Sequence, residues 1–110
     1  FLANDKMINE ESDVLSAFLR ACAKGFADMK ADPEAALATL LANQNEENFP
    51  LSETVERKSM EALLPMMESA EAAFLTQTDA CWQENIDWML SQGLIQNSVT
   101  PDDVRVNLAY

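Results

Sequence analysis

The segment covering residues 79–95 constrains the fold most, because it combines an apolar helical face, both tryptophans and a helix stop. Its apolar residues recur at helical spacing, and the residues between them are polar. These apolar residues are Trp82, Ile86, Met89 and Leu90. Gly93 follows and can adopt the left-handed conformation that ends a helix. We therefore expect a helix capped by Thr78 or Asp79, with Leu94 and Ile95 folding back onto the core.

Two more helices are expected in the first part of the chain. We interpret residues 1–7 as the stub of a strand that enters a loop. Asn9 is expected to cap a first helix that runs to about Lys30, because apolar residues recur every three or four positions along it. Asp32, followed by a proline and an acid, predicts the start of a second helix that stops by Gln44.

The last two predicted helices also begin at recognisable capping residues. Ser52 opens a third helix, which Pro65 interrupts because proline has no amide hydrogen to donate. Residues 68–78 lack an apolar stripe, so we expect them to be irregular. Thr100 precedes a proline and two acids and predicts a short final helix ending near Leu108. The fold class is therefore all-α, with about five helices in a single helical unit over residues 1–110.

The charge balance narrows the classes of partner. Nineteen acidic and seven basic residues give a formal net charge of −12 over 110 residues. Such a charge repels phosphate backbones and anionic lipid surfaces, so nucleic-acid binding is not expected. No run of 20 apolar residues that could span a membrane occurs in the sequence. We interpret the acidity as a solvated surface rather than as an acidic recognition patch.

The sequence contains no recognisable catalytic or metal-binding motif. It has no histidine, which is the commonest general base near neutral pH and the commonest zinc ligand. Glu46 with Glu47 and Asp102 with Asp103 are adjacent acids, and adjacent side chains point apart, so we interpret them as caps or solvated charges. We predict no enzyme, no catalytic residue, no metal and no cofactor, and we assign no ligand-binding residue.

The cysteines and tryptophans leave alternatives open. A disulfide between Cys22 and Cys81 remains possible, but both residues adjoin apolar helix faces, so buried thiols are favoured. Trp82 and Trp88 are six positions apart and point to different sides of one helix. The simpler interpretation is that Trp82 packs inward and Trp88 covers a neighbouring loop. The alternative is that one of them contacts a ligand or a further domain.

Three successive motifs resemble a known family. The first is the run F-L-R-A-C-A-K-G at residues 18–25, the second is D-P-E at residues 32–34, and the third is D-W-M-L-S-Q-G-L-I at residues 87–95. Their order and spacing resemble the C-terminal part of the ABC-importer solute-binding proteins of the thiamine-pyrimidine-precursor, nitrate, sulfonate and taurine group. The resemblance spans nearly all of the chain. The matched residues are of the helix-packing kind, so no ligand contact is carried over.

The resemblance implies a larger protein with two α/β lobes that hold a small solute between them. This chain would be its helical C-terminal portion. Its partners would be that solute, such as a thiamine-pyrimidine precursor, and the membrane subunits of the importer. The location would be extracytoplasmic, although no signal is visible in this chain. The alternative is a free-standing helical module that binds another protein. We also expect the isolated chain to self-associate, because helices that should cover absent strands leave apolar surface exposed.

Overall fold

The computed structural model describes residues 1–45, 47 and 49–110, and every regular element in this part of the chain is helical. The elements are α1 (Asp5–Glu10), α2 (Ser12–Ala31), α3 (Pro33–Ala42), α4 (Glu53–Leu63), the 3₁₀ helix η1 (Leu64–Met66), α5 (Asp79–Ser91) and α6 (Pro101–Val104). The all-α prediction is confirmed. The described residues contain six α-helices rather than five, because the strand expected near the N-terminus is a helix.

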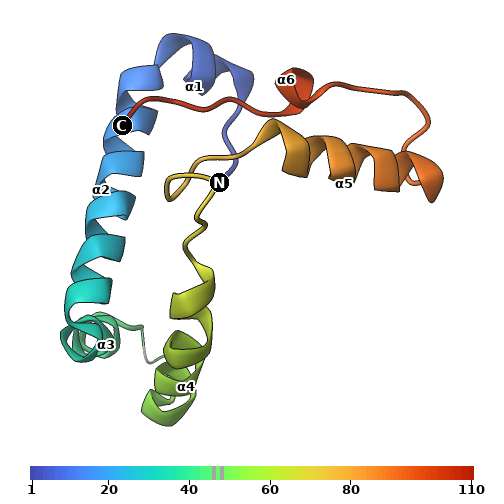
Figure 1. Ribbon diagram of the computed structural model, residues 1–110. Coiled ribbons are helices and arrows are strands. Elements are labelled where there is room, and N and C mark those ends of the chain that lie inside the picture. The colour runs from blue at the N-terminus through green and yellow to red at the C-terminus, as the bar shows by residue number, and fades with distance from the viewer. Residues whose placement is uncertain (46, 48) are drawn as a thin grey trace.

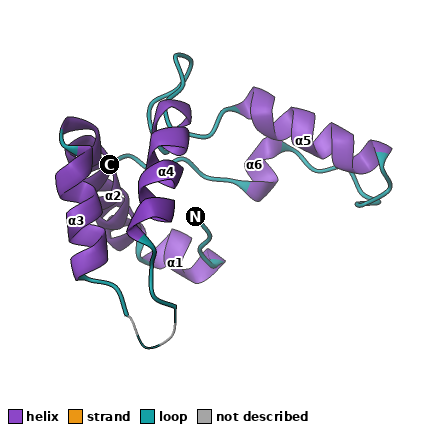
Figure 2. Cartoon of the chain, turned by 90° about the horizontal axis from the view of Figure 1, so that it is seen from below, coloured by secondary structure: helices purple, strands orange, loops and turns teal. Residues whose placement is uncertain are grey.

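The helices form two arms. In the N-terminal arm, α2 packs against α1 and α3, and α3 packs against α4. In the C-terminal arm, α5 packs against α6. Both views of the chain show α5 projecting away from α2, α3 and α4, with the segment after η1 connecting the arms (Figures 1 and 2). The N-terminus and the extended C-terminal segment lie near the junction of the two arms (Figure 1).

The buried core is small for a chain of this length. Among the described residues, the buried hydrophobic side chains are Phe26, Leu37 and Ile86. The radius of gyration is 17.5 Å, whereas a compact domain of this length has a value of about 13 Å. The accessible surface is 8485 Å², whereas a compact protein of this mass exposes about 6,100 Å². The two arms therefore leave a large surface uncovered.

The prediction for the N-terminal residues was wrong. Residues 5–10 form α1, and Asn4 caps it by accepting a hydrogen bond of 2.9 Å from the amide of Met7. Asp5 adds an acid to the first turn, where the helix dipole favours negative charge. Asn9 lies inside α1 and is not the cap of the following helix. The backbone leaves helical geometry at Glu11, where φ is −131°, and α2 begins at Ser12.

Most of the other predicted boundaries agree with the structure. Asp32 caps α3 by accepting a hydrogen bond of 3.0 Å from the amide of Ala35. Pro65 falls where α4 gives way to η1, and residues 67–78 contain no helix. Gly93 has a φ of +68° after the end of α5, as expected. Leu94 departs from the prediction, because 63% of its surface is exposed and it does not fold back onto the core.

The last helix is shorter than predicted. It ends at Val104 instead of near Leu108, and Arg105 is extended, with φ −144° and ψ 159°. Arg105 contacts Asp79 at the start of α5, and Asn107 is hydrogen-bonded to Gln77 just before that helix, so this segment is held in its extended form. No helix in the described part of the chain is long and apolar enough to cross a membrane.

Candidate functional site

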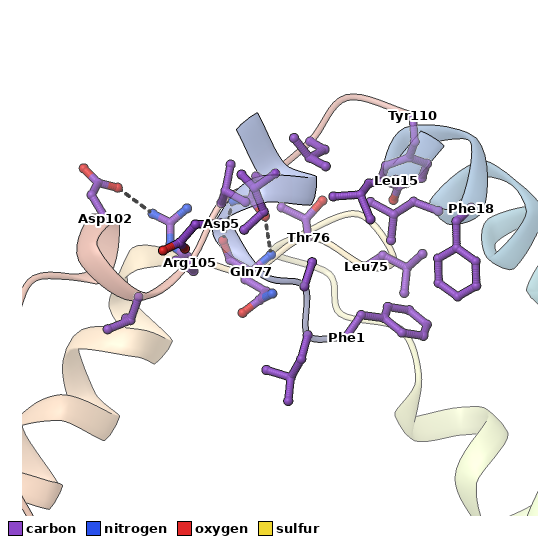
Figure 3. Close-up of a pocket in the computed structure, with 18 of the residues that line it drawn as sticks. Phe1, Asp5, Leu15, Phe18, Leu75, Thr76, Gln77, Asp102, Arg105 and Tyr110 are labelled. Atoms are coloured by element: carbon purple, nitrogen blue, oxygen red, sulfur yellow. Dashed lines mark hydrogen bonds and ion pairs between the residues drawn. The ribbon is translucent and has the colours of Figure 1, made fainter. Parts of the chain in front are cut away.

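A hollow with a volume of about 850 Å³ lies at the junction of the two arms. It is formed by the N-terminal residues, α1, the first turns of α2, the loop at residues 75–77 and the C-terminal segment from Asp102 to Tyr110. Figure 3 shows that Phe1, Phe18 and Leu75 lie toward one end, while Gln77 and Arg105 lie toward the other. The hollow therefore has an apolar end and a polar end.

Gln77 connects three segments at the polar end. Its amide nitrogen donates to Asn107 Oδ1 over 3.0 Å, and its carbonyl oxygen accepts from Asn107 Nδ2 over 2.8 Å. Its side-chain oxygen accepts a hydrogen bond from Trp82 Nε1. The residue before α5, the first turns of α5 and the C-terminal segment are therefore fixed to one another.

Arg105 is the most buried charged side chain at the junction, since only 9% of its side-chain surface is exposed. Its guanidinium contacts Asp79 at the start of α5 and lies 3.5 Å from a carboxylate oxygen of Asp102. Its Nε is buried and has no hydrogen-bond partner among the described residues. Arg105 therefore connects α5 to α6 through two acids. The buried Nε donor that has no partner reduces the stability of the fold by about 1–3 kcal/mol.

Aromatic side chains form the apolar end and its edge. The rings of Phe1 and Phe18 meet edge to face, with their centroids 5.1 Å apart. The hydroxyl of Tyr110 donates to the carbonyl oxygen of Phe74, which joins the end of the C-terminal segment to the connection between the arms. An apolar wall with a few fixed polar groups is typical of sites that bind small molecules. The arrangement is suited to binding, and no described group of His, Cys, Asp and Glu residues could hold a metal ion.

A second hollow of about 330 Å³ lies between α3, α4 and the end of α2. Its lining is mainly apolar and includes Met29, Leu37, Leu40, Met60, Leu63, Leu64 and Met67. The exposed fractions of the Leu40 and Leu63 side chains are 47% and 52%. This groove is an uncovered apolar face of the N-terminal arm.

The structure shows the state of the two cysteines and the exposure of the two tryptophans. Cys22 and Cys81 are both free thiols. The expectation that both are buried was wrong, because Cys22 is half-buried and Cys81 is exposed. Trp82 is half-buried and lines the larger hollow, as the inward interpretation required. Trp88 has 57% of its surface exposed and lies outside both hollows.

The adjacent acids near the C-terminus act as a cap and an ion-pair partner. Asp103 accepts hydrogen bonds from the amide and the hydroxyl of Thr100, at 2.8 and 2.7 Å, and these bonds hold the pKa of Asp103 below its usual value. Asp102 points to Arg105 instead. Their interpretation as caps or surface charges is confirmed. For the other pair, Glu46 lies outside the described residues.

No sequence pattern identified four of the residues that line the larger hollow. They are Gln77, Arg105, Asn107 and Tyr110. Glutamine and asparagine carry no motif here, and their pairing depends on segments that are 30 residues apart. Arg105 offered one signal, because it is the only basic residue after Lys58. A lone cation among acids indicates an ion pair, and that signal would have predicted its contacts.

A comparison with protein families indicates the class of protein that the N-terminal third of the chain resembles. Residues 1–36 match the family described as NMT1/THI5 like. This match covers α1, α2 and the start of α3, and it includes the first two of the three motifs noted in the sequence. The motif at residues 87–95 lies outside it. No solved structure matches the chain.

The comparison with curated proteins then gives a particular relative. The chain is 37% identical over 102 residues to the formylaminopyrimidine-binding protein of Halalkalibacterium halodurans. The alignment covers 93% of this chain and 31% of that protein, so the chain spans about a third of the length of the relative. Together the two matches confirm the resemblance to solute-binding proteins of the thiamine-precursor group.

Proposed function

We propose that this chain is part of an extracytoplasmic solute-binding protein of an ABC importer. The observation that carries the proposal is the 37% identity to a formylaminopyrimidine-binding protein across 93% of the chain. In the whole protein this helical unit would form part of a two-lobed body, as its C-terminal portion. The solute would be a thiamine-pyrimidine precursor or a similar small heterocycle.

The uncovered surface supports this proposal. The chain exposes about 40% more surface than a compact protein of its mass. Large side chains are among the exposed groups, including Phe1 at 74% and Met66 at 77%. Monomeric proteins rarely expose large contiguous apolar patches. A larger body with additional lobes would cover this surface.

Solute binding by the native polypeptide tests the proposal. Formylaminopyrimidine would be titrated into the polypeptide purified from its source, and thermal unfolding would be followed at each concentration. A ligand that binds only the folded state stabilises it by about 2.7 kcal/mol at 100 times its Kd, so we expect a saturable rise in Tm. Thiamine serves as a second ligand to define the solute class. A Tm unchanged by any pyrimidine would contradict this function.

We also propose that the isolated chain self-associates through the groove of the N-terminal arm. Leu40, Leu63 and Met67 are exposed along this groove. The net charge of −12 opposes association, so self-association should strengthen as salt screens the charge. Sedimentation velocity at low and high salt measures this. A single monomeric species at high protein concentration in both salts would contradict the proposal.

A further inference from the structure

The outer face of α5 presents an exposed tryptophan beside acidic and polar residues and the exposed thiol of Cys81. Ile86 has no exposed surface, and Met89 and Trp82 are half-buried, so these residues define the inner face. At 100° per residue, Trp88 falls on the opposite side. It is 57% exposed. Packing against the rest of the described chain does not account for an aromatic residue at this position.

Two exposed acids, Glu84 and Asp87, lie on the outer part of α5 with this tryptophan, and no cation of the described residues pairs with them. Residues 69–110 contain six acids and a single basic residue, Arg105. The guanidinium of Arg105 is already held by Asp79 and Asp102. No ion pair in the described part of the chain involves Glu84 or Asp87 (the carboxylate of Asp87 accepts a hydrogen bond of 2.9 Å from Gln83). The face therefore carries negative charge that is open to a partner.

The spacing of these groups fits one kind of side chain. Glu84 lies four residues before Trp88, so the two Cβ atoms are about 5–6 Å apart on the same face of the helix. A guanidinium stacked within about 6 Å of the indole ring gains a cation–π interaction. From that position it can also form a charge-assisted hydrogen bond to the carboxylate of Glu84. Arginine satisfies both groups at once.

We propose that the outer face of α5, centred on Trp88 and Glu84, docks a basic segment of another polypeptide through its arginine side chains. Charge complementarity selects this occupant. A second copy of the chain would bring two acidic faces together, and an anionic lipid surface would be repelled. None of the outer-face residues Glu84, Asp87 and Trp88 lines either hollow, so the surface does not depend on the identity of the solute.

Binding of labelled oligoarginine to the full chain tests this inference, with fluorescence anisotropy as the readout. We expect Trp88→Ala and Glu84→Gln each to weaken binding about 3- to 5-fold, since a cation–π contact and an ion pair at exposed positions are each modest contributions. Phe49→Ala is the matched aromatic control, because Phe49 is 86% exposed on another part of the molecule. Glu61→Gln is the matched charge control, because Glu61 is an exposed acid of α4. Neither control should change the affinity by more than about twofold.

Two further comparisons sharpen the test. Oligolysine should bind more weakly than oligoarginine, because ammonium groups lack the planar stacking surface. Trp88→Phe should retain more affinity than Trp88→Ala, and circular dichroism of each variant verifies its helix content. Equal weakening by Glu84→Gln and Glu61→Gln would overturn the inference in favour of diffuse charge attraction. An unchanged affinity in Trp88→Ala would also overturn it, as would stronger binding of the chain to lipid vesicles than to oligoarginine.

Discussion

The two arms of the molecule are held together by different kinds of interaction. In the N-terminal arm, Phe26 and Leu37 are buried, and the ring of Phe26 stacks on Phe74 with a centroid distance of 3.9 Å. The C-terminal arm has one buried hydrophobic residue, Ile86. Its long-range hydrogen bonds and ion pairs involve Arg105, Asn107 and Tyr110.

This difference predicts different responses to perturbation. Apolar burial is insensitive to salt and pH, and it contributes about 25 cal/mol per Å² of buried surface. Exposed hydrogen bonds and ion pairs contribute about 1 kcal/mol or less each and respond to pH and ionic strength. The N-terminal arm should therefore depend on a few large side chains. The C-terminal arm should depend on one buried side chain, Ile86, and on many small contacts.

The largest effect is expected from Phe26→Ala. Removing the ring leaves a cavity beside Phe74 and should destabilise the N-terminal arm by about 3–5 kcal/mol. Urea unfolding followed by the far-UV circular dichroism of the whole chain measures the loss. Phe49→Ala is the matched control and should change stability by less than about 0.5 kcal/mol, because Phe49 is 86% exposed. Equal effects of the two substitutions would show that the stacked pair is not a core.

Ile86→Ala should have the next largest effect, about 2–5 kcal/mol, because Ile86 is fully buried. Hydrogen exchange should show that the loss of protection is confined to α5 and α6, since α5 packs against α6 rather than against the N-terminal arm. Val104→Ala provides a control on the same arm at a side chain that is 43% exposed. Loss of protection throughout α2 and α3 would contradict the independence of the two arms.

Asn107→Ala should have a smaller effect, about 1 kcal/mol, because it removes two hydrogen bonds at a solvent-exposed position. The expected result is faster amide exchange at Gln77 and local release of the C-terminal segment, with α2 to α4 unchanged. Asn97→Ala is the control, because Asn97 lies in the exposed loop after α5. An unchanged exchange rate at Gln77 would rule out the pairing.

The smallest expected effect is a dependence of the stability of α6 on pH. The pKa of Asp103 in the folded chain is below its ordinary value of 3.8, because the amide and then the hydroxyl of Thr100 donate hydrogen bonds to its carboxylate. Its stabilising contribution is therefore complete above the ordinary value and is lost as the pH falls through the lower folded value. NMR shifts of residues 100–104 between about pH 5 and about pH 2 measure this loss. Asp103→Asn should remove the transition, and its persistence would assign the titration to another group.

The contrast between the arms also explains how much could be predicted from the sequence. Caps and breaks such as Asp32, Pro65 and Gly93 act within a few residues, so the helices from α3 to α5 could be placed in advance. The N-terminal helix was missed because Asn4 was treated as part of a loop. Local signals favoured extending α6, but Arg105 is held in extended geometry by Asp79, which lies 26 residues earlier.

The candidate site was less predictable than the helices. Its polar end depends on Gln77 and Asn107, which have no distinctive spacing and meet only after the chain has folded. Trp82 and Trp88 could be assigned to different faces of α5 from their separation alone. The sequence could not show that the described chain leaves Trp88 exposed, because that depends on the position of α5 relative to the other arm.

The mass and location of the native polypeptide test the central claim most directly. Immunoblotting of fractionated source cells, followed by peptide mass spectrometry, identifies the polypeptide that carries this sequence. If the chain is part of a solute-binding protein, the polypeptide that carries it should be far larger than 12.2 kDa. It should also occur in the envelope or membrane fraction. A product of about 12.2 kDa confined to the cytosol would contradict that account, and it would favour a free-standing helical module that binds other proteins.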